Sequence, residues 1–225
     1  LADAEHVFVY LPFQAVHLPV QAPQEFTDRY LGVYDQGWSE LRQQRRAKAI
    51  ELGIIAADTP MQAMHTTGDW HSLSADQRRY QSKRMAVYAG MVEAMDFHIG
   101  RLVEYLETTQ QLDNTIFIFT SDNGSEPGGA ADPESGALGF FLGLMDYDTD
   151  YDNLGLKGSW NSIGPSFASA SASPLAYYKF HAGEGGLRVP LIISGTPLSV
   201  AAPMTDAFAY VTDITPTILE LAGVS

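Results

Sequence analysis

The sequence contains no cysteine, which excludes a disulfide framework and thiolate chemistry within these 225 residues. It is also poor in basic residues, since 13 Lys and Arg face 27 Asp and Glu, for a net charge of −14. Binding to nucleic acid requires a basic surface, so we expect no nucleic-acid partner. No apolar run approaches the roughly 20 residues that cross a membrane, so we expect no transmembrane segment. An anionic substrate would need a local positive site on this acidic protein.

The two ends of the sequence look like cut points inside a longer protein. The sequence begins at Leu1 without an initiator Met or a signal-like stretch, and it ends at Ser225 directly after a helical pattern. At 225 residues it is long enough for one substantial core. We therefore expect residues 1–225 to be part of a single domain. Neither the compartment nor the oligomeric state follows from the sequence.

Hydrophobic patterning predicts an α/β fold. Apolar runs rich in β-branched and aromatic residues predict three strands, at residues 7–11, 115–120 and 188–193. The second of these runs is unbroken, which is typical of a strand buried on both faces. From 83 to 107 the apolar residues recur at three- and four-residue steps, which predicts a long amphipathic helix.

Two further segments complete the predicted organisation. A helix is expected over residues 213–222, with Pro216 in its first turn. Residues 125–176 are rich in Gly, Ser, Asp and Pro, so they are either a functional loop or a disordered insertion. The acidic run at 146–153 does not fit a calcium-binding EF-hand, because Asn153 stands where that loop needs Gly.

Four residues are candidates for chemistry. Asp122 and Asn123 follow the second predicted strand, where a carboxylate and an amide oxygen would suit Ca²⁺ or Mg²⁺, although a strand-ending turn uses the same residues. His17 lies in a loop stiffened by Pro19, where an imidazole could give a proton to a leaving oxygen or have no role. Lys179 precedes a Gly-Gly turn and could present a positive charge to an oxyanion, although most lysines do nothing of the kind.

The stretch at 151–179 resembles the large loop of bacterial arylsulfatases, and the order of five segments resembles the sulfatase family. These segments are residues 16–23, 88–102, 120–124, 179–190 and 213–219. The resemblance implies an alkaline-phosphatase-like sandwich, in which helices flank a central, mostly parallel sheet. It also implies one Ca²⁺ and a formylglycine nucleophile made from a cysteine. By position, Asp122 and Asn123 would be calcium ligands, His17 would face the ester oxygen and Lys179 would face a sulfate oxygen.

The nucleophile element of the family is missing from this sequence. No position fits Cys-x-Pro or Ser-x-Pro followed by Arg, and the paired aspartates that supply the other calcium ligands are also absent. We therefore expect a fragment that lacks the nucleophile-bearing N-terminal segment and the C-terminal region, that is inactive alone, and whose parent hydrolyses a small-molecule sulfate ester. The alternatives are a phosphatase or phosphonate hydrolase of the same superfamily, or a non-catalytic remnant or binding module.

Overall fold

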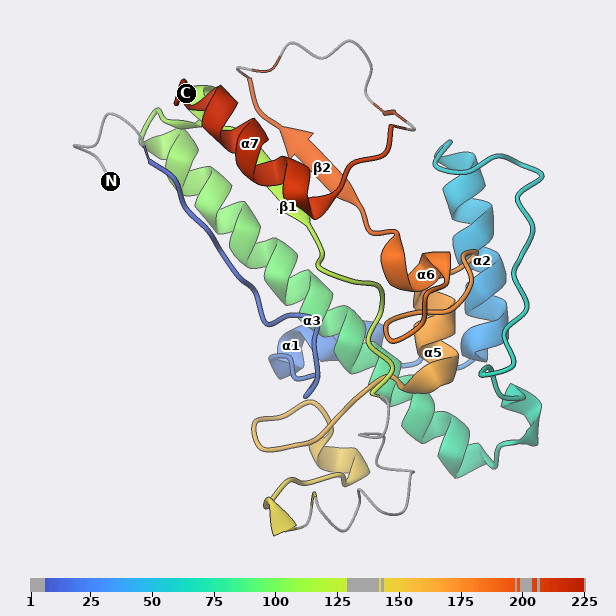
Figure 1. The fold of residues 1–225 in the computed structure, drawn as a ribbon. Helices are drawn as coiled ribbons and strands as arrows, with labels where there is room; N and C mark the ends of the chain where they lie inside the picture. Colours follow the sequence, from blue (N-terminus) through green and yellow to red (C-terminus); the bar gives the residue numbers. More distant parts are fainter. Residues whose placement is uncertain are drawn as a thin grey trace.

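A long helix is the central element of the computed structural model, which describes residues 7–128, 142, 144–196, 198, 204–205 and 207–224. This helix, α3, spans Ala75–Thr108 and confirms the helix predicted at 83–107 (Figure 1). It begins earlier than predicted because Ser74 and Gln77 form a capping box, with Ser74 Oγ accepting from the Gln77 N–H and Gln77 Oε1 accepting from the Ser74 N–H. Its polar first turns hid this start from the hydrophobic pattern.

A two-stranded antiparallel sheet is formed by β1 (Phe117–Thr120) and β2 (Leu191–Ser194). Phe117 pairs with Ser194 and Thr120 with Leu191. Both strands begin later than predicted, and Pro190, which cannot donate a ladder hydrogen bond, directly precedes β2. The central, mostly parallel sheet is not observed in the described residues and stays a prediction.

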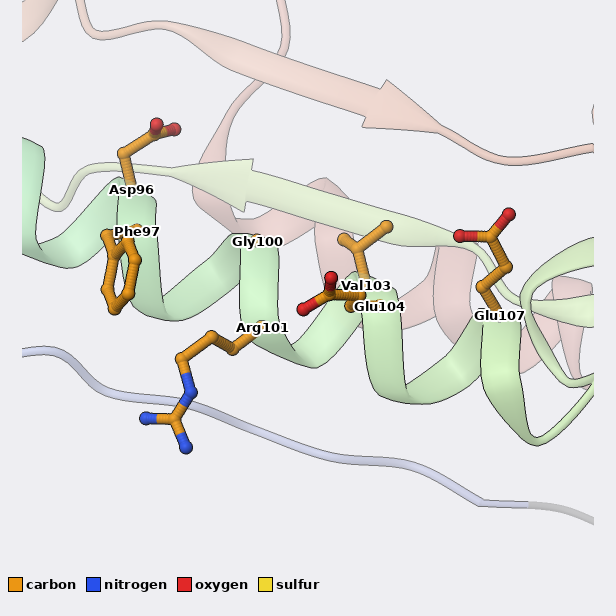
Figure 2. A pocket seen from close by; sticks show the side chains of 7 residues that line it. All are labelled: Asp96, Phe97, Gly100, Arg101, Val103, Glu104 and Glu107. Atoms are coloured by element: carbon orange, nitrogen blue, oxygen red, sulfur yellow. The ribbon is translucent and has the colours of Figure 1, made fainter.

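The strand predicted at residues 7–11 is wrong. This segment has no regular secondary structure, and Phe8 and Tyr10 are 70% and 77% exposed. It runs alongside α3 on the side away from the sheet (Figures 1 and 2). A strand requires a hydrogen-bonded neighbour, and the described residues place none beside this segment.

The predicted burial of β1 on both faces is also wrong, because Phe119 is 37% exposed. One face of the sheet is covered by α7 (Val211–Leu221), as Figure 1 shows. Between them lies a cavity of about 120 Å³ that is lined by Ile118, Ile193 and Ile214 among others. The helix begins two residues before the predicted 213, so Pro216 lies inside it and not in its first turn.

The main core lies at the other end of the molecule, where α2 (Gly37–Glu51) packs on α5 (Gly164–Ser171). Aromatic rings pack edge-on in it: Trp38 meets Trp70 at 4.7 Å and Phe167 at 5.4 Å between centroids. Phe167 and Ala168 are completely buried, so part of the segment predicted as a loop or insertion, 125–176, is core. The remaining short elements are α1 (Gln24–Thr27), α6 (Glu184–Leu187) and 3₁₀ turns at Asp28–Tyr30, Trp70–Ser72, Leu112–Asn114 and Tyr151–Asn153.

Buried Arg84 on α3 connects the helix to the segment that precedes α5. Its guanidinium donates to the Ser162 carbonyl at 2.5 Å and to Ser162 Oγ at 2.8 Å. Asn161 in turn donates to the Arg84 carbonyl. The segment is therefore fixed to α3 by polar contacts inside the core. No helix in the described part of the chain combines the length and apolar character needed to cross a membrane.

Candidate functional site

The loop that carries His17 is anchored immediately after that residue. Val20 N–H donates to the Asn161 carbonyl at 2.7 Å, and Ala22 N–H donates to the Gly155 carbonyl at 3.1 Å. Val20 is 2% exposed and packs against Val87 of α3. The contacts that fix residues 155–162 to the helix therefore also fix the position of His17.

Lys179 is placed by the residues on each side of it. Tyr178 is 3% exposed and belongs to the main core, and this burial raises the pKa of its phenol. Tyr177 and Phe180 have φ of 65° and 75°, the left-handed region that bulky residues rarely adopt. The backbone N–H of Lys179 donates to the Ser125 carbonyl at 3.1 Å. This unusual backbone buries Tyr178 while Lys179 lies against the loop after β1.

Lys179 and His17 meet in the structure although 162 positions separate them. Lys179 Nζ lies 2.8 Å from His17 Nε2. The other ring nitrogen, Nδ1, lies 2.9 Å from the Leu18 carbonyl, an acceptor only, so it carries the hydrogen. Nε2 is then the nitrogen that accepts from the lysine ammonium.

A third residue, Glu126, joins this pair and was not found by the sequence reasoning. Its Oε2 lies 2.7 Å from Lys179 Nζ and 3.5 Å from His17 Nε2. The residue is only 8% exposed, and its Oε1 accepts from the Gly128 N–H at 2.9 Å. In the sequence, Glu126 is an acidic residue between the turn at 121–124 and a Pro-Gly pair. Acidic residues in such positions are common in loops, and the pattern specifies no partner.

Close backbone packing holds the loop after β1 against the turn at α6. Gly124 N–H donates to the Gly186 carbonyl at 3.0 Å. A Cβ on Gly124 would lie 1.9 Å from the Gly185 carbonyl oxygen, and one on Gly185 would lie 2.1 Å from the Tyr177 carbonyl oxygen. Glycine is needed at both positions because backbone meets backbone there. This docking brings Glu126 to Lys179.

Asp122 and Asn123 lie at the carboxyl end of β1, in the loop that leads to Glu126. Asp122 is exposed, and Asn123 uses Nδ2 to donate to the Gly124 carbonyl, which leaves its Oδ1 as an acceptor. Within the described residues, neither side chain is hydrogen-bonded or ion-paired to His17 or Lys179, and no group of three or more His, Cys, Asp or Glu gathers to hold a metal. The structure thus joins two of the four predicted site residues directly and places the other two in the adjoining loop.

Three aromatic residues, at positions 160, 177 and 178, could contact an aryl group, but they are mostly structural. Tyr178 is in the core, and Trp160 packs edge-on against Tyr147 at 5.0 Å. Tyr177 stacks on His181 at 4.7 Å, and its hydroxyl lies 3.2 Å from His65 Nδ1. Of the three, only Tyr177 remains a candidate neighbour of the site.

A separate depression of about 400 Å³ runs along α3, as Figure 2 shows. Its ionisable lining consists of three carboxylates and one guanidinium, from Asp96, Glu104, Glu107 and Arg101. In Figure 2 Phe97 and Arg101 point toward the N-terminal segment, whereas Asp96 points toward the sheet. An excess of negative charge is unsuited to a sulfate ester, so we do not place the substrate there.

The described geometry defines an enzyme-like site: a lysine, a histidine and a buried carboxylate meet beside the loop that ends a strand. The sulfatase family model matches residues 2–224, and the chain belongs to the sulfatase family. It is 38% identical over 224 residues to an arylsulfatase of Klebsiella aerogenes, and this alignment covers 97% of the chain and 46% of that protein.

Two other relatives extend the comparison. An uncharacterised sulfatase of Schizosaccharomyces pombe is 38% identical over 98% of the chain and 40% of its own length. A multifunctional alkaline phosphatase superfamily protein of Trinickia caryophylli is 44% identical over 43 residues, which are 19% of the chain and 8% of that protein. The chain therefore spans less than half the length of these relatives.

Proposed function

We propose that this chain is part of the catalytic domain of a sulfuric ester hydrolase of the arylsulfatase type. The observation that carries the proposal is the contact between Lys179 Nζ and His17 Nε2 at 2.8 Å. Cleavage of a sulfate ester needs a positive donor for the sulfate oxygens and a proton for the leaving oxygen. Family membership supports assigning these two tasks to this pair.

Lys179 would bind a sulfate oxygen. Its ammonium has three N–H donors, and Glu126 Oε2 and His17 Nε2 accept two of them at 2.7 and 2.8 Å. The third N–H is then available to an oxyanion. The side chain is 19% exposed, and a partly desolvated ammonium interacts with an anion more strongly than one in water.

His17 would deliver a proton to the leaving-group oxygen. Nδ1 is held by the Leu18 carbonyl at 2.9 Å, so Nε2 is the nitrogen from which the proton would leave. Nε2 accepts from Lys179 only while the ring is neutral, so delivery of the proton would use the protonated ring, in which Nε2 donates to the leaving oxygen instead. The side chain is 50% exposed, so a substrate can reach it. The nucleophile is expected from a segment outside this sequence, as formylglycine.

The chain's oxygen donors fit part of a calcium site. Asp122 offers an exposed carboxylate and Asn123 an unused amide oxygen, one directly after the other at the end of β1. Ca²⁺ prefers six to eight oxygen ligands, so Asp122 and Asn123 would share the ion with residues elsewhere in the protein. When bound, calcium would offset the negative charge of the sulfate group.

The test is an assay of the complete protein that contains this chain, with chromogenic aryl sulfate and aryl phosphate at equal concentrations. We expect sulfate turnover, and Lys179→Ala and His17→Ala should each lower kcat/KM by about 100-fold or more. Lys48→Ala is the control, because Lys48 lies on α2 in an exposed pair with Glu51.

The other outcomes separate the alternatives. Faster turnover of the phosphate would favour a phosphatase. The short match to the multifunctional alkaline phosphatase superfamily protein supports this alternative. If Lys179→Ala and His17→Ala both keep wild-type turnover of the two esters, His17 and Lys179 have no part in the reaction. Turnover of neither ester by the wild-type protein would favour a binding module.

A further inference from the structure

Glu126 is a buried carboxylate to which the proposed reaction gives no task. Its side chain is 7% exposed, although carboxylates are rarely buried unless they are paired. Its negative charge would repel a sulfate ester, so it cannot serve as a substrate-binding group. Its contacts with two proposed catalytic residues indicate a different role.

The two carboxylate oxygens have separate partners. Oε1 accepts from the Gly128 N–H at 2.9 Å, which fixes the carboxylate to its own loop. Oε2 lies 2.7 Å from Lys179 Nζ. Lysine carries its charge on a flexible four-carbon stem, so an ammonium without such a partner samples many positions. The loop that carries Glu126 is docked on both sides of Ser125, through the Gly124 N–H on the Gly186 carbonyl and through the Ser125 carbonyl on the Lys179 N–H.

We propose that Glu126 is a positioning residue that holds the Lys179 ammonium in the direction of the substrate, a role whose catalytic consequence rests on the proposed sulfatase function. Glu126 and His17 together occupy two of the three ammonium hydrogens, at 2.7 and 2.8 Å. The direction of the third is then set by the tetrahedral nitrogen. Glu126 acts through Lys179 and does not touch the substrate.

An amide at position 126 cannot replace the carboxylate. Gln offers one acceptor oxygen and one NH₂ group, whereas the site presents two donors, the Gly128 N–H and the Lys179 ammonium. In either orientation of the amide, one donor meets another donor. Asp would keep both acceptors and the charge but would draw them back by one methylene group. Glu126→Gln and Glu126→Asp therefore separate the requirement for the carboxylate from the requirement for its reach.

The first arm of the test is a double-mutant cycle in the complete protein with a chromogenic aryl sulfate. A displacement of about 1 Å at a catalytic group costs on the order of 100-fold, so Glu126→Gln should lower kcat/KM by about 10- to 100-fold. In a Lys179→Ala background the same change should cost less than about 2-fold, because the residue through which Glu126 acts is gone. Glu126→Asp should recover part of the activity.

The second arm measures lysine reactivity and needs no activity. Acetic anhydride labelling followed by mass spectrometry should show Lys179 reacting several-fold faster in Glu126→Gln than in the wild type, since the ammonium is released from a site where it is only 19% exposed. Glu51→Gln is the matched control. Glu51 pairs with Lys48 at 2.6 Å, but both side chains are at least 60% exposed, so Lys48 labelling should change less than about 2-fold.

The two arms distinguish the possible failures. A wild-type protein that turns over no sulfate ester overturns the proposed function, while the labelling still decides whether Glu126 holds Lys179. A loss from Glu126→Gln that is equally large in both backgrounds, or unchanged labelling of Lys179, overturns the positioning role. A smaller loss in the Lys179→Ala background together with faster labelling of Lys179 supports it.

Discussion

Gly124→Ala tests the docking of the loop after β1 on the α6 turn. The added Cβ would lie 1.9 Å from the Gly185 carbonyl oxygen, and real Cβ atoms essentially never approach another heavy atom within 3.0 Å. One of the two backbone segments must therefore move by more than about 1 Å. Gly185 is itself closely packed, because its N–H donates to the Ala176 carbonyl at 2.8 Å and a Cβ on it would lie 2.1 Å from the Tyr177 carbonyl oxygen.

We expect this substitution to affect both stability and activity. Overpacking typically costs about 1–3 kcal/mol, and a clash between two backbones should lie near the upper end. The moving segment carries Asp122 and Asn123 on one side of Gly124 and Glu126 on the other, so kcat/KM should fall by roughly 100-fold. Urea unfolding and aryl sulfate turnover of the complete protein measure the two effects.

Gly100→Ala is the matched control. Gly100 lies within α3, and a Cβ there would meet no atom within 4 Å. Alanine is favoured over glycine in a helix by about 1 kcal/mol, so this variant should be slightly more stable and as active as the wild type. A Gly124→Ala protein whose unfolding midpoint and kcat/KM match those of Gly100→Ala would refute the close packing described here.

Two further predictions concern pH and completeness. Burial raises the pKa of Tyr34 to about 12, so as pH rises above its ordinary value of 10 the unfolded protein ionises first. Because the side chain is partly exposed and solvent screens the effect, roughly 1–2 kcal/mol of stability should be lost between pH 10 and 12. Urea unfolding at pH 9 and 11.5 should show a smaller loss in Tyr34→Phe, and an equal loss would contradict the assignment. The 225-residue chain made alone should neither turn over an aryl sulfate nor bind calcium more tightly than about millimolar in calorimetry. Turnover equal to that of the complete protein would place the nucleophile within this sequence.

The elements that the sequence predicts well are those whose signal is local. The apolar periodicity of α3 and the apolar runs of β1 and β2 lie within the elements themselves. The run at 7–11 has the composition of a strand, but a strand exists only beside a partner, which the run itself cannot specify. The segment at 164–171 is composed mainly of Ala, Ser and Gly, and its burial depends on Trp38 and Trp70 from distant positions.

The candidate site shows the same division. His17 and Lys179 were identified because the order of short motifs resembles a family, and the structure joins them directly. Glu126 could not be identified in this way. Its burial and its partners depend on two residues on distant segments and on a glycine contact that forms only when the loop docks. A carboxylate in a loop has no local feature that distinguishes it from a solvated one.

The charges around Lys179 show what this chain contributes to an anion site. Glu126 lies 2.7 Å from the ammonium, and Asp122 adds a carboxylate in the same loop. Two unit charges 4 Å apart interact by about 4 kcal/mol at an intermediate dielectric, so repulsion from Glu126 offsets much of the attraction that Lys179 exerts on a sulfate. A net charge of −14 adds to the repulsion. These side chains therefore supply direction more than net positive charge, and binding of a sulfate ester would require a further cation. The calcium expected at Asp122 and Asn123 is suited to this, because it would neutralise the carboxylate that holds it.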